Sequence, residues 1–272
     1  MLVFRCTTKV FRKVGSRPRA VEISHTEPTL GEWYVNTVDY LNDGDLLIAC
    51  MHSPSLYTLL VPIQPKLDAE GLVHAFCAHL LARLIELETP PDAAQRILAA
   101  YQGGAVLAKT TSRKVLGHLN AALREMEFVL EAPEDFVNEG NKLIVPKIEH
   151  RLNTTPRGAS KDCIWPLREF WNYVRSVCSE LPPRLPLYLW TSPSSKVLDT
   201  LDNEFREHLP LRLASKLHAT LQRVDVLFSA DELEILSEAI RKMASLRHGQ
   251  QSKLLEDLHR LVGIQLERLR EG

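Results

Sequence analysis

The chain has 272 residues, of which 45% are hydrophobic and 25% charged, an ordinary balance for a globular protein with a sizeable core. Lysine and arginine number 33 against 34 aspartates and glutamates, so the net charge of −1 excludes a wholesale nucleic-acid coat and leaves room only for local basic patches. With 12 glycines and 16 prolines, the composition also excludes a collagen-like repeat and a glycine-rich linker protein.

Cysteine usage and the first residues of the chain indicate its compartment. The five cysteines are odd in number and none is spaced C-x-x-C, which predicts free thiols in a reducing cytosol. The first residues are basic and lack an apolar run of signal-peptide length, and no stretch approaches the roughly 18 apolar residues of a membrane helix. We therefore expect a cytoplasmic protein without a membrane span.

Turn signals in the N-terminal part predict a small antiparallel sheet. The segment Asn42-Asp43-Gly44-Asp45 separates two apolar runs, which is typical of a β-hairpin. Strands are expected at Leu2–Thr7, Trp33–Leu41, Leu46–His52 and Leu56–Val61, with a short helix at Thr8–Val14 and a loop over 15–31. The most economical interpretation is an antiparallel meander.

Helices follow this predicted sheet. Apolar pairs that recur every four residues from Leu72 to Ile85 predict an amphipathic helix over 69–87. Thr89 as N-cap and Pro90 at the first helical position predict a second helix that ends near Tyr101. The further elements expected are a strand at Ala105–Lys109, a helix at 113–130 capped within Thr110–Ser112 and a helix at Trp165–Ser179. Residues 131–163 are expected to be irregular, with one short helical or extended piece.

A proline-rich strap at 181–195 marks the best candidate boundary, since four prolines stand within it. Beyond it the sequence predicts helices at 196–208, 211–226, 230–247 and 252–270, and the pattern Ser229 to Glu232 is a capping box. The expected fold class is α+β, a small antiparallel sheet packed with helices and followed by an all-helical C-terminal region. The expected domains are a mixed domain at 1–180 and a helical domain at 196–272.

Signatures of common enzymes and cofactor sites are absent from the sequence. It contains no P-loop, dinucleotide-binding, nucleophile-elbow or zincin motif and no clustered cysteine and histidine ligands. The ten histidines are dispersed, and His74 and His79 stand five apart on one predicted helix, which is the wrong spacing for a shared metal. We expect no cofactor and no metal site.

Two basic clusters are the main candidates for a site. One precedes the first acid, Glu22, and the other surrounds Thr110–Ser112, where a strand ends and a helix begins. Solvated surface charge and ordinary helix capping are the competing explanations. From these clusters we predict an anion-binding pocket with neutral asparagine donors at its edge, formed by Arg5, Lys9, Lys109, Arg113, Asn36 and Asn120.

Within the second cluster, Arg113-Lys-Val-Leu-Gly-His118 has the form R-x-x-x-x-H. That form is the catalytic signature of HEPN-type ribonucleases, in which histidine supplies a group that titrates near neutrality. The alternative catalytic hypothesis therefore assigns Arg113 and His118 to the reaction. A chance match competes with it, because HEPN domains are all-helical and this helix contains Gly117 next to a predicted sheet.

Five short pieces occur in the order seen in a known family. The chain resembles a family of uncharacterised bacterial domains, catalogued as a domain of unknown function, over about residues 1–170. The matching pieces are Arg5-Cys6-Thr7-Thr8-Lys9, Trp33-Tyr-Val-Asn36, Leu56-Tyr57-Thr-Leu-Leu-Val61-Pro62, Arg113-Lys-Val-Leu-Gly117-His-Leu-Asn120 and Leu152-Asn153-Thr-Thr-Pro156. The resemblance implies a bacterial, often mobile-element-associated cytoplasmic protein without an assigned activity, and it implies a small residue where His118 stands here.

Two functions from different classes follow. The first is a non-enzymatic binding or regulatory protein that recognises a phosphate-bearing or protein partner. Its C-terminal helices would mediate assembly with a protein partner or as a homo-oligomer, and the resemblance implies a toxin–antitoxin or phage-defence locus. The second is a ribonuclease-like enzyme that acts on nucleic acid through the basic pocket. Geometry separates the two: if the first strand and the strand that ends at Lys109 are neighbours, the basic residues converge on one pocket, and if these strands are far apart, the enzyme hypothesis fails.

The strap generates a prediction about domain division. Proline removes a backbone donor and fixes φ, so neither a helix nor a central strand passes through 181–193. We expect limited proteolysis to release a fragment near residues 1–180, identified by mass spectrometry. A single uncut product at complete digestion of an unfolded control would show that the strap is packed and that the chain is one body.

Overall fold

The computed structural model describes residues 2–18, 31–38, 46–63, 67–99, 101, 105–131, 144–158, 163–186, 205–206, 208–221, 227–245 and 250–271. The contacts among residues divide the chain into two compact units, Met1–Leu181 and Pro182–Gly272. Each unit has buried apolar side chains of its own.

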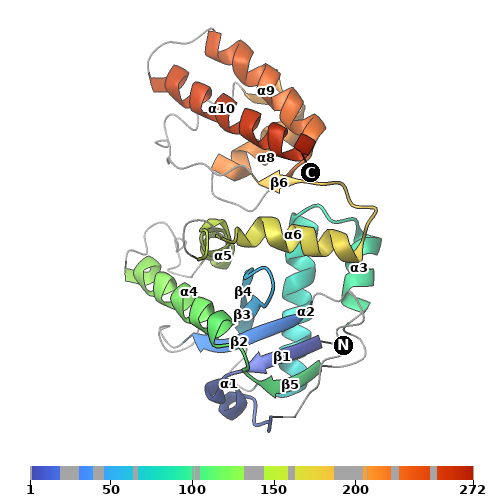
Figure 1. Ribbon diagram of the computed structural model, residues 1–272, viewed down its shortest axis with the longest axis vertical. Coiled ribbons are helices and arrows are strands. Elements are labelled where there is room, and N and C mark those ends of the chain that lie inside the picture. Colours follow the sequence, from blue (N-terminus) through green and yellow to red (C-terminus); the bar gives the residue numbers. More distant parts are fainter. Residues whose placement is uncertain are drawn as a thin grey trace. The chain divides into compact units, whose positions relative to one another are not determined.

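Unit 1 contains a five-stranded sheet (Figure 1). Its strands are β1 (Leu2–Cys6), β2 (Glu32–Val38), β3 (Leu46–His52), β4 (Thr58–Ile63) and β5 (Ala105–Lys109), in the order β4-β3-β2-β1-β5. The predicted meander is confirmed for β2, β3 and β4, which pair antiparallel. However, β1 pairs in parallel with both β2 and β5, so the sheet is mixed. The predicted hairpin turn at Asn42–Asp45 lies outside the described residues.

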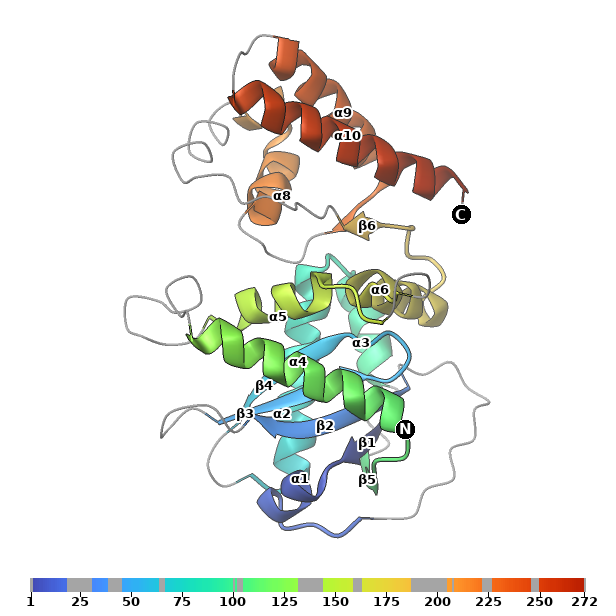
Figure 2. The ribbon, with the colours of Figure 1, turned by 60° about the vertical axis from the view of Figure 1, so that its left-hand side comes forward.

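Helices cover both faces of this sheet, as Figure 2 shows. One face is covered by α2 (Ala69–Glu86), α3 (Pro91–Ala99) and α6 (Pro166–Val177), and the other by α4 (Arg113–Glu131) and α5 (Val145–Thr154). Side chains alternate along a strand, so neighbouring residues of β2 contribute to the apolar cores on opposite faces of the sheet. Trp33 packs edge-on against Phe76 of α2 with ring centroids 4.8 Å apart, whereas Tyr34 shares a core with Leu119 of α4. The short α1 (Thr8–Lys13) follows β1.

The start of α3 differs from the expectation. Thr89 was expected as its N-cap, but the Thr89 N–H donates to the Leu84 carbonyl and the Glu88 N–H donates to the Ile85 carbonyl. Glu88 has a φ of 57°, which lies in the left-handed region. The two hydrogen bonds and this φ form a Schellman motif at the end of α2, in which glutamate occupies the position usually taken by glycine. Thr89 therefore ends one helix instead of starting the next, and no described residue bonds its buried hydroxyl.

The free edge of β4 is closed by two side chains of α5. The Thr58 N–H donates to Asn153 Oδ1 at 2.7 Å and Asn153 Nδ2 donates back to the Thr58 carbonyl at 2.9 Å. One turn earlier on α5, Glu149 accepts the Leu60 N–H. The next outward-facing position of the strand is Pro62, which has no N–H. The outward N–H groups of Thr58 and Leu60 are thus paired without another strand and Pro62 offers none, which protects this edge of the sheet.

The carboxylate of Glu149 is also neutralised from α2. His79 Nε2 lies 2.8 Å from Oε1, and Arg83 Nε lies 2.8 Å from Oε2. Because the Glu149 side chain is only 1% exposed, these two partners replace the water contacts that a carboxylate loses on burial. The network therefore joins β4, α2 and α5 at one point of the core.

Unit 2 is mainly helical, with α8 (Leu211–Leu221), α9 (Ala230–Ser245) and α10 (Gln250–Glu271) around their own apolar core. The predicted capping box is confirmed, since the Ser229 N–H donates to Glu232 and the Glu232 N–H donates to Ser229 Oγ. Lys216, 6% exposed, donates to Glu232 and to the Leu227 carbonyl. A two-residue ladder of β6 (Leu185–Pro186) and β7 (Leu227–Phe228) is an addition to the expected all-helical pattern. Part of the predicted helix 196–208 lies outside the described residues.

Asn153 gives a test of the edge closure. We expect Asn153→Ala to lower the free energy of unfolding by about 2–4 kcal/mol, because it leaves both buried backbone groups of Thr58 without partners. Chemical denaturation measures the difference. The matched control is Asn172→Ala, an exposed asparagine of α6, which should change stability by less than about 0.5 kcal/mol. Equal effects of the two substitutions would contradict the role of Asn153.

Candidate functional site

The carboxyl ends of β1, β2 and β5 meet at one edge of the sheet, because the three strands run in parallel. The chain leaves β1 into α1 and leaves β5 into α4 at this edge (Figure 1). Ligands of open parallel sheets bind at such an edge. We call the group formed here by Thr7, Asn36 and Asn120 the polar edge.

The polar edge is a continuous chain of hydrogen bonds. Thr7 Oγ1 donates to Asn36 Oδ1 at 2.8 Å, and the Thr37 N–H donates to the same oxygen at 3.0 Å. Asn36 Nδ2 in turn donates to Asn120 Oδ1 at 3.4 Å, at the protein surface. Residues from β1, β2 and α4, which are far apart in sequence, therefore present polar atoms together.

Tyr34 fixes the start of α4 beside the polar edge. Its hydroxyl accepts the Ser112 N–H at 2.8 Å and lies 3.0 Å from Thr111 Oγ1. Ser112 Oγ accepts the Val115 N–H, so the predicted capping of this helix within Thr110–Ser112 is confirmed. Since Asn120 lies two turns further along α4, this anchoring also sets its position relative to β2.

The four basic residues of the predicted anion pocket have different surroundings. Arg5 is 7% exposed, forms an ion pair with Glu32 at 2.7 Å and donates to the Lys109 carbonyl at 3.4 Å, so its charge is already balanced. Lys109 pairs in register with Cys6, whereas Arg5 pairs with Ala108, so the side chains of Lys109 and Arg5 leave opposite faces of the sheet. Lys9 and Arg113 are exposed on α1 and α4.

Asn36 and Asn120 are brought into contact as the predicted pocket requires, and β1 and β5 are neighbours. Arg113 lies on the same face of α4 as Asn120, since seven residues turn a helix through almost two full turns. No described residue forms an ion pair or hydrogen bond with the Arg113 side chain. Sequence reasoning missed Thr7 and Tyr34, although Thr7 lies inside the piece Arg5-Cys6-Thr7.

Arg113 and His118 are not brought together as a catalytic pair. Both belong to the regular helix α4, where five residues separate side chains by about 140° around the axis. The pKa of His118 is lowered by burial, which is the largest cause, and by the positive charges of Lys114 and Arg157. The flank of α4 that carries His118 is therefore distinct from the flank that carries Asn120.

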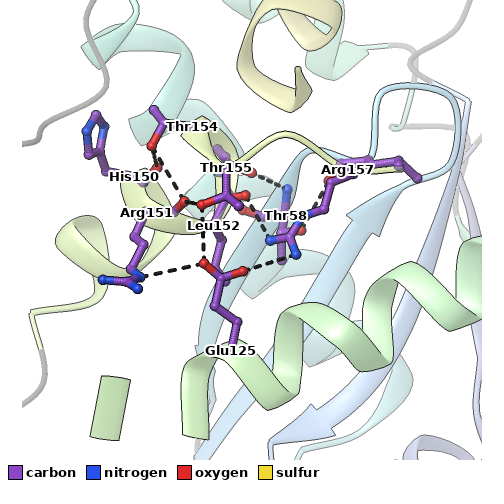
Figure 3. Close-up of polar contacts among 10 residues, drawn as sticks. Thr58, Glu125, His150, Arg151, Leu152, Thr154, Thr155 and Arg157 are labelled. Carbon is purple, nitrogen blue, oxygen red and sulfur yellow. Dashed lines mark hydrogen bonds and ion pairs between the residues drawn. The ribbon is translucent and has the colours of Figure 1, made fainter. Parts of the chain in front are cut away.

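On the flank of His118, α4 and α5 are connected by a second polar network (Figure 3). Glu125 of α4 lies 3.1 Å from Arg157 and 3.5 Å from Arg151, and it accepts from Thr155 Oγ1 at 3.2 Å. Arg157 donates to the Leu152 carbonyl at 2.9 Å. Burial lowers the pKa of Arg157 and the carboxylate of Glu125 opposes this shift. These contacts fix the end of α5 to α4, although the buried Nε of Arg157 has no hydrogen-bond partner among the described residues.

Histidine, cysteine and carboxylate side chains, the types that ligate metals, are present among the residues that the structure describes. No group of three or more histidine, cysteine, aspartate or glutamate residues there could hold a metal ion. All five cysteines are free thiols, and burial raises the pKa of Cys6 to about 12 and that of Cys50 well above its usual value. These two thiols are therefore protonated and unreactive at neutral pH. No described helix is long and apolar enough to span a bilayer.

These features define an α+β domain with a candidate ligand site at the carboxyl ends of its parallel strands. Residues 3–169 match the family described as Domain of unknown function (DUF6933), and the chain belongs to that family. The match confirms the resemblance found in the sequence and covers the whole polar edge. No curated protein and no solved structure matches the chain.

The surroundings of His118 generate a prediction about its titration. An NMR titration should give its imidazole a pKa below 6.5, and Lys114→Ala should raise that pKa because one positive neighbour is removed. The His118 imidazole binds a proton less readily in the folded chain than in the unfolded chain. The free energy of unfolding therefore decreases as pH falls from the unfolded pKa of about 6.5 through the lower pKa of the folded state. A value at or above 6.5 in the unsubstituted protein would contradict the assignment.

Proposed function

We propose that this protein is a non-enzymatic binding protein whose ligand-recognition site is the polar edge of unit 1. The observation that carries the proposal is the hydrogen-bonded chain Thr7–Asn36–Asn120, which gathers three polar side chains from separate segments of the family domain. It lies where parallel strands end and two helices begin. That is the position at which sheets of this kind bind ligands.

A purely structural role explains this chain of contacts poorly. The bond between Asn36 and Asn120 is exposed to solvent and 3.4 Å long, so it exchanges with water at little net gain. The start of α4 is already fixed by the bonds to Tyr34 and Ser112, which do not involve either asparagine. Recognition of a ligand gives a reason for placing a half-buried and an exposed amide side by side at this edge.

The ribonuclease-like alternative has less support. Its two catalytic residues, Arg113 and His118, project to different sides of α4. General acid–base catalysis needs both groups within hydrogen-bond reach of the reacting atoms. Among the described residues, no histidine or carboxylate forms a hydrogen bond with Asn36 or Asn120 that could serve as a second catalytic group.

We extend the proposal to the helical unit and to the cellular setting. Unit 2 carries exposed apolar side chains, Leu211 at 72% and Ile235 at 46%, which support assembly with a protein partner or a second copy through these helices. A regulatory role in a toxin–antitoxin or phage-defence locus and a cytoplasmic location belong to the same proposal. Their support is the family resemblance alone, and the adjacent genes test the first of them.

An NMR screen of the full ¹⁵N-labelled chain against mixtures of polar metabolites tests the binding function. We expect a binder to shift the side-chain amide signals of Asn36 and Asn120 and the backbone signal of Thr37. Asn120→Ala should weaken binding at least tenfold, which corresponds to about 1.4 kcal/mol, while the melting temperature changes by only a few degrees. Asn172→Ala on α6 is the matched control and should leave binding unchanged. Binders whose signals map only to other regions would refute this function for the polar edge.

A further inference from the structure

The polar edge has a direction, which follows from the orientation of Asn36. A backbone N–H can only donate, so the bond from Thr37 identifies the Asn36 atom that it contacts as the oxygen. That oxygen also accepts from Thr7 Oγ1. The Asn36 nitrogen must then point to Asn120 and donate to its oxygen. Along this series of hydrogen bonds each asparagine uses its oxygen as an acceptor. The N–H groups of Asn120 remain as donors at the outer end of the series.

Asn120 is the outer end of this chain. Its oxygen accepts from Asn36, and no other described residue bonds its amide nitrogen, which keeps two N–H donors at the surface. Arg113 adds an exposed guanidinium on the same face of α4, without an ion-pair partner among the described residues. The exposed groups therefore combine donors with positive charge.

Gly117 leaves space between these two donors. It stands four residues after Arg113 and three before Asn120, so it neighbours both on the helix surface. A Cβ placed there would meet no described atom within 4 Å, and the φ of Gly117 is not in the left-handed region. Neither packing against the described residues nor backbone conformation explains a glycine in this helix, where alanine is more favourable. A ligand that lies against the helix backbone explains why a residue without a side chain stands at this position.

We propose that the group recognised at the polar edge is an oxyanion, a carboxylate or a phosphate, bound by Asn120 Nδ2 and the Arg113 guanidinium over Gly117. The inference rests on the proposed binding function and names the chemistry of its ligand. An oxyanion accepts hydrogen bonds from both donors and carries the charge that a guanidinium fork pairs with. A ligand group that offers only N–H or O–H donors meets less acceptor capacity, because the Asn36 oxygen already accepts two hydrogen bonds and the Asn120 oxygen accepts one.

Titration of the full ¹⁵N-labelled chain with inorganic phosphate, acetate and neutral acetamide tests the inference. Phosphate or acetate should shift the Asn120 side-chain amide and Arg113 Nε signals in a saturable manner, whereas acetamide should not. The phosphate and acetate arms distinguish the two sources of an oxyanion. Arg113→Gln should weaken the effective anion at least tenfold, while Lys114→Gln, which removes an adjacent exposed charge on a different side of α4, should change its affinity less than twofold.

Gly117→Leu adds a readout that a structural role would not give. The leucine should abolish anion binding by occupying the open space, and it should raise the melting temperature because it favours the helix. Equal binding of acetamide and the anions, or unchanged anion binding in Gly117→Leu or Arg113→Gln, would overturn the oxyanion inference. The metabolite screen decides the binding function separately, since a neutral binder at the polar edge supports that function and refutes the oxyanion.

Discussion

The parallel pairing of β1 with β2 on one side and with β5 on the other is the constraint on which the site depends. It aligns three strand ends, so that Thr7 follows β1 beside Asn36 of β2 and α4 starts directly after β5. If β1 ran antiparallel, Thr7 would lie at the opposite edge and the hydrogen bond to Asn36 could not form. The Tyr34 hydroxyl of β2 accepts the Ser112 N–H and so fixes the start of α4 relative to the sheet. This places Asn120 of α4 within hydrogen-bond reach of Asn36.

The opposite side of the sheet shows how the same fold avoids an open edge. The outward N–H groups of β4 are paired by Asn153 and Glu149 or are missing at Pro62, so α5 takes the place of a sixth strand. Two of the segments noted in the sequence, Leu56 to Pro62 and Leu152 to Pro156, each contribute one half of this closure, the strand backbone and the Asn153 side chain. These residues hold α5 in place and are distinct from the polar edge.

Much of the fold could be predicted from the sequence because its signals are local. Apolar periodicity predicted α2 and α4, and the pattern Ser229 to Glu232 predicted a capping box that the structure contains. The prediction of Thr89 as an N-cap was wrong because the preceding Glu88 adopts the left-handed conformation that ends α2. Glycine normally marks such a helix end in a sequence, and here glutamate stands in its place. Strand order has no such local signal, so the parallel placement of β1 and β5 was not predicted. Nor could sequence alone show which of the 34 acids pairs with Arg5.

Two asparagines from the family pattern, Asn153 and Asn120, illustrate why residue type alone does not assign a role. Asn153 is fully buried and both ends of its amide are bonded to the backbone of Thr58, so its hydrogen-bonding capacity is used within the fold. Asn120 is exposed and bonded only through its oxygen, so its N–H groups are available to another molecule. The saturation of hydrogen bonds, together with exposure, separates a residue that stabilises the fold from one that recognises a ligand. By the same criterion Arg157 and Arg5 belong to the fold, while Arg113 belongs to the proposed site.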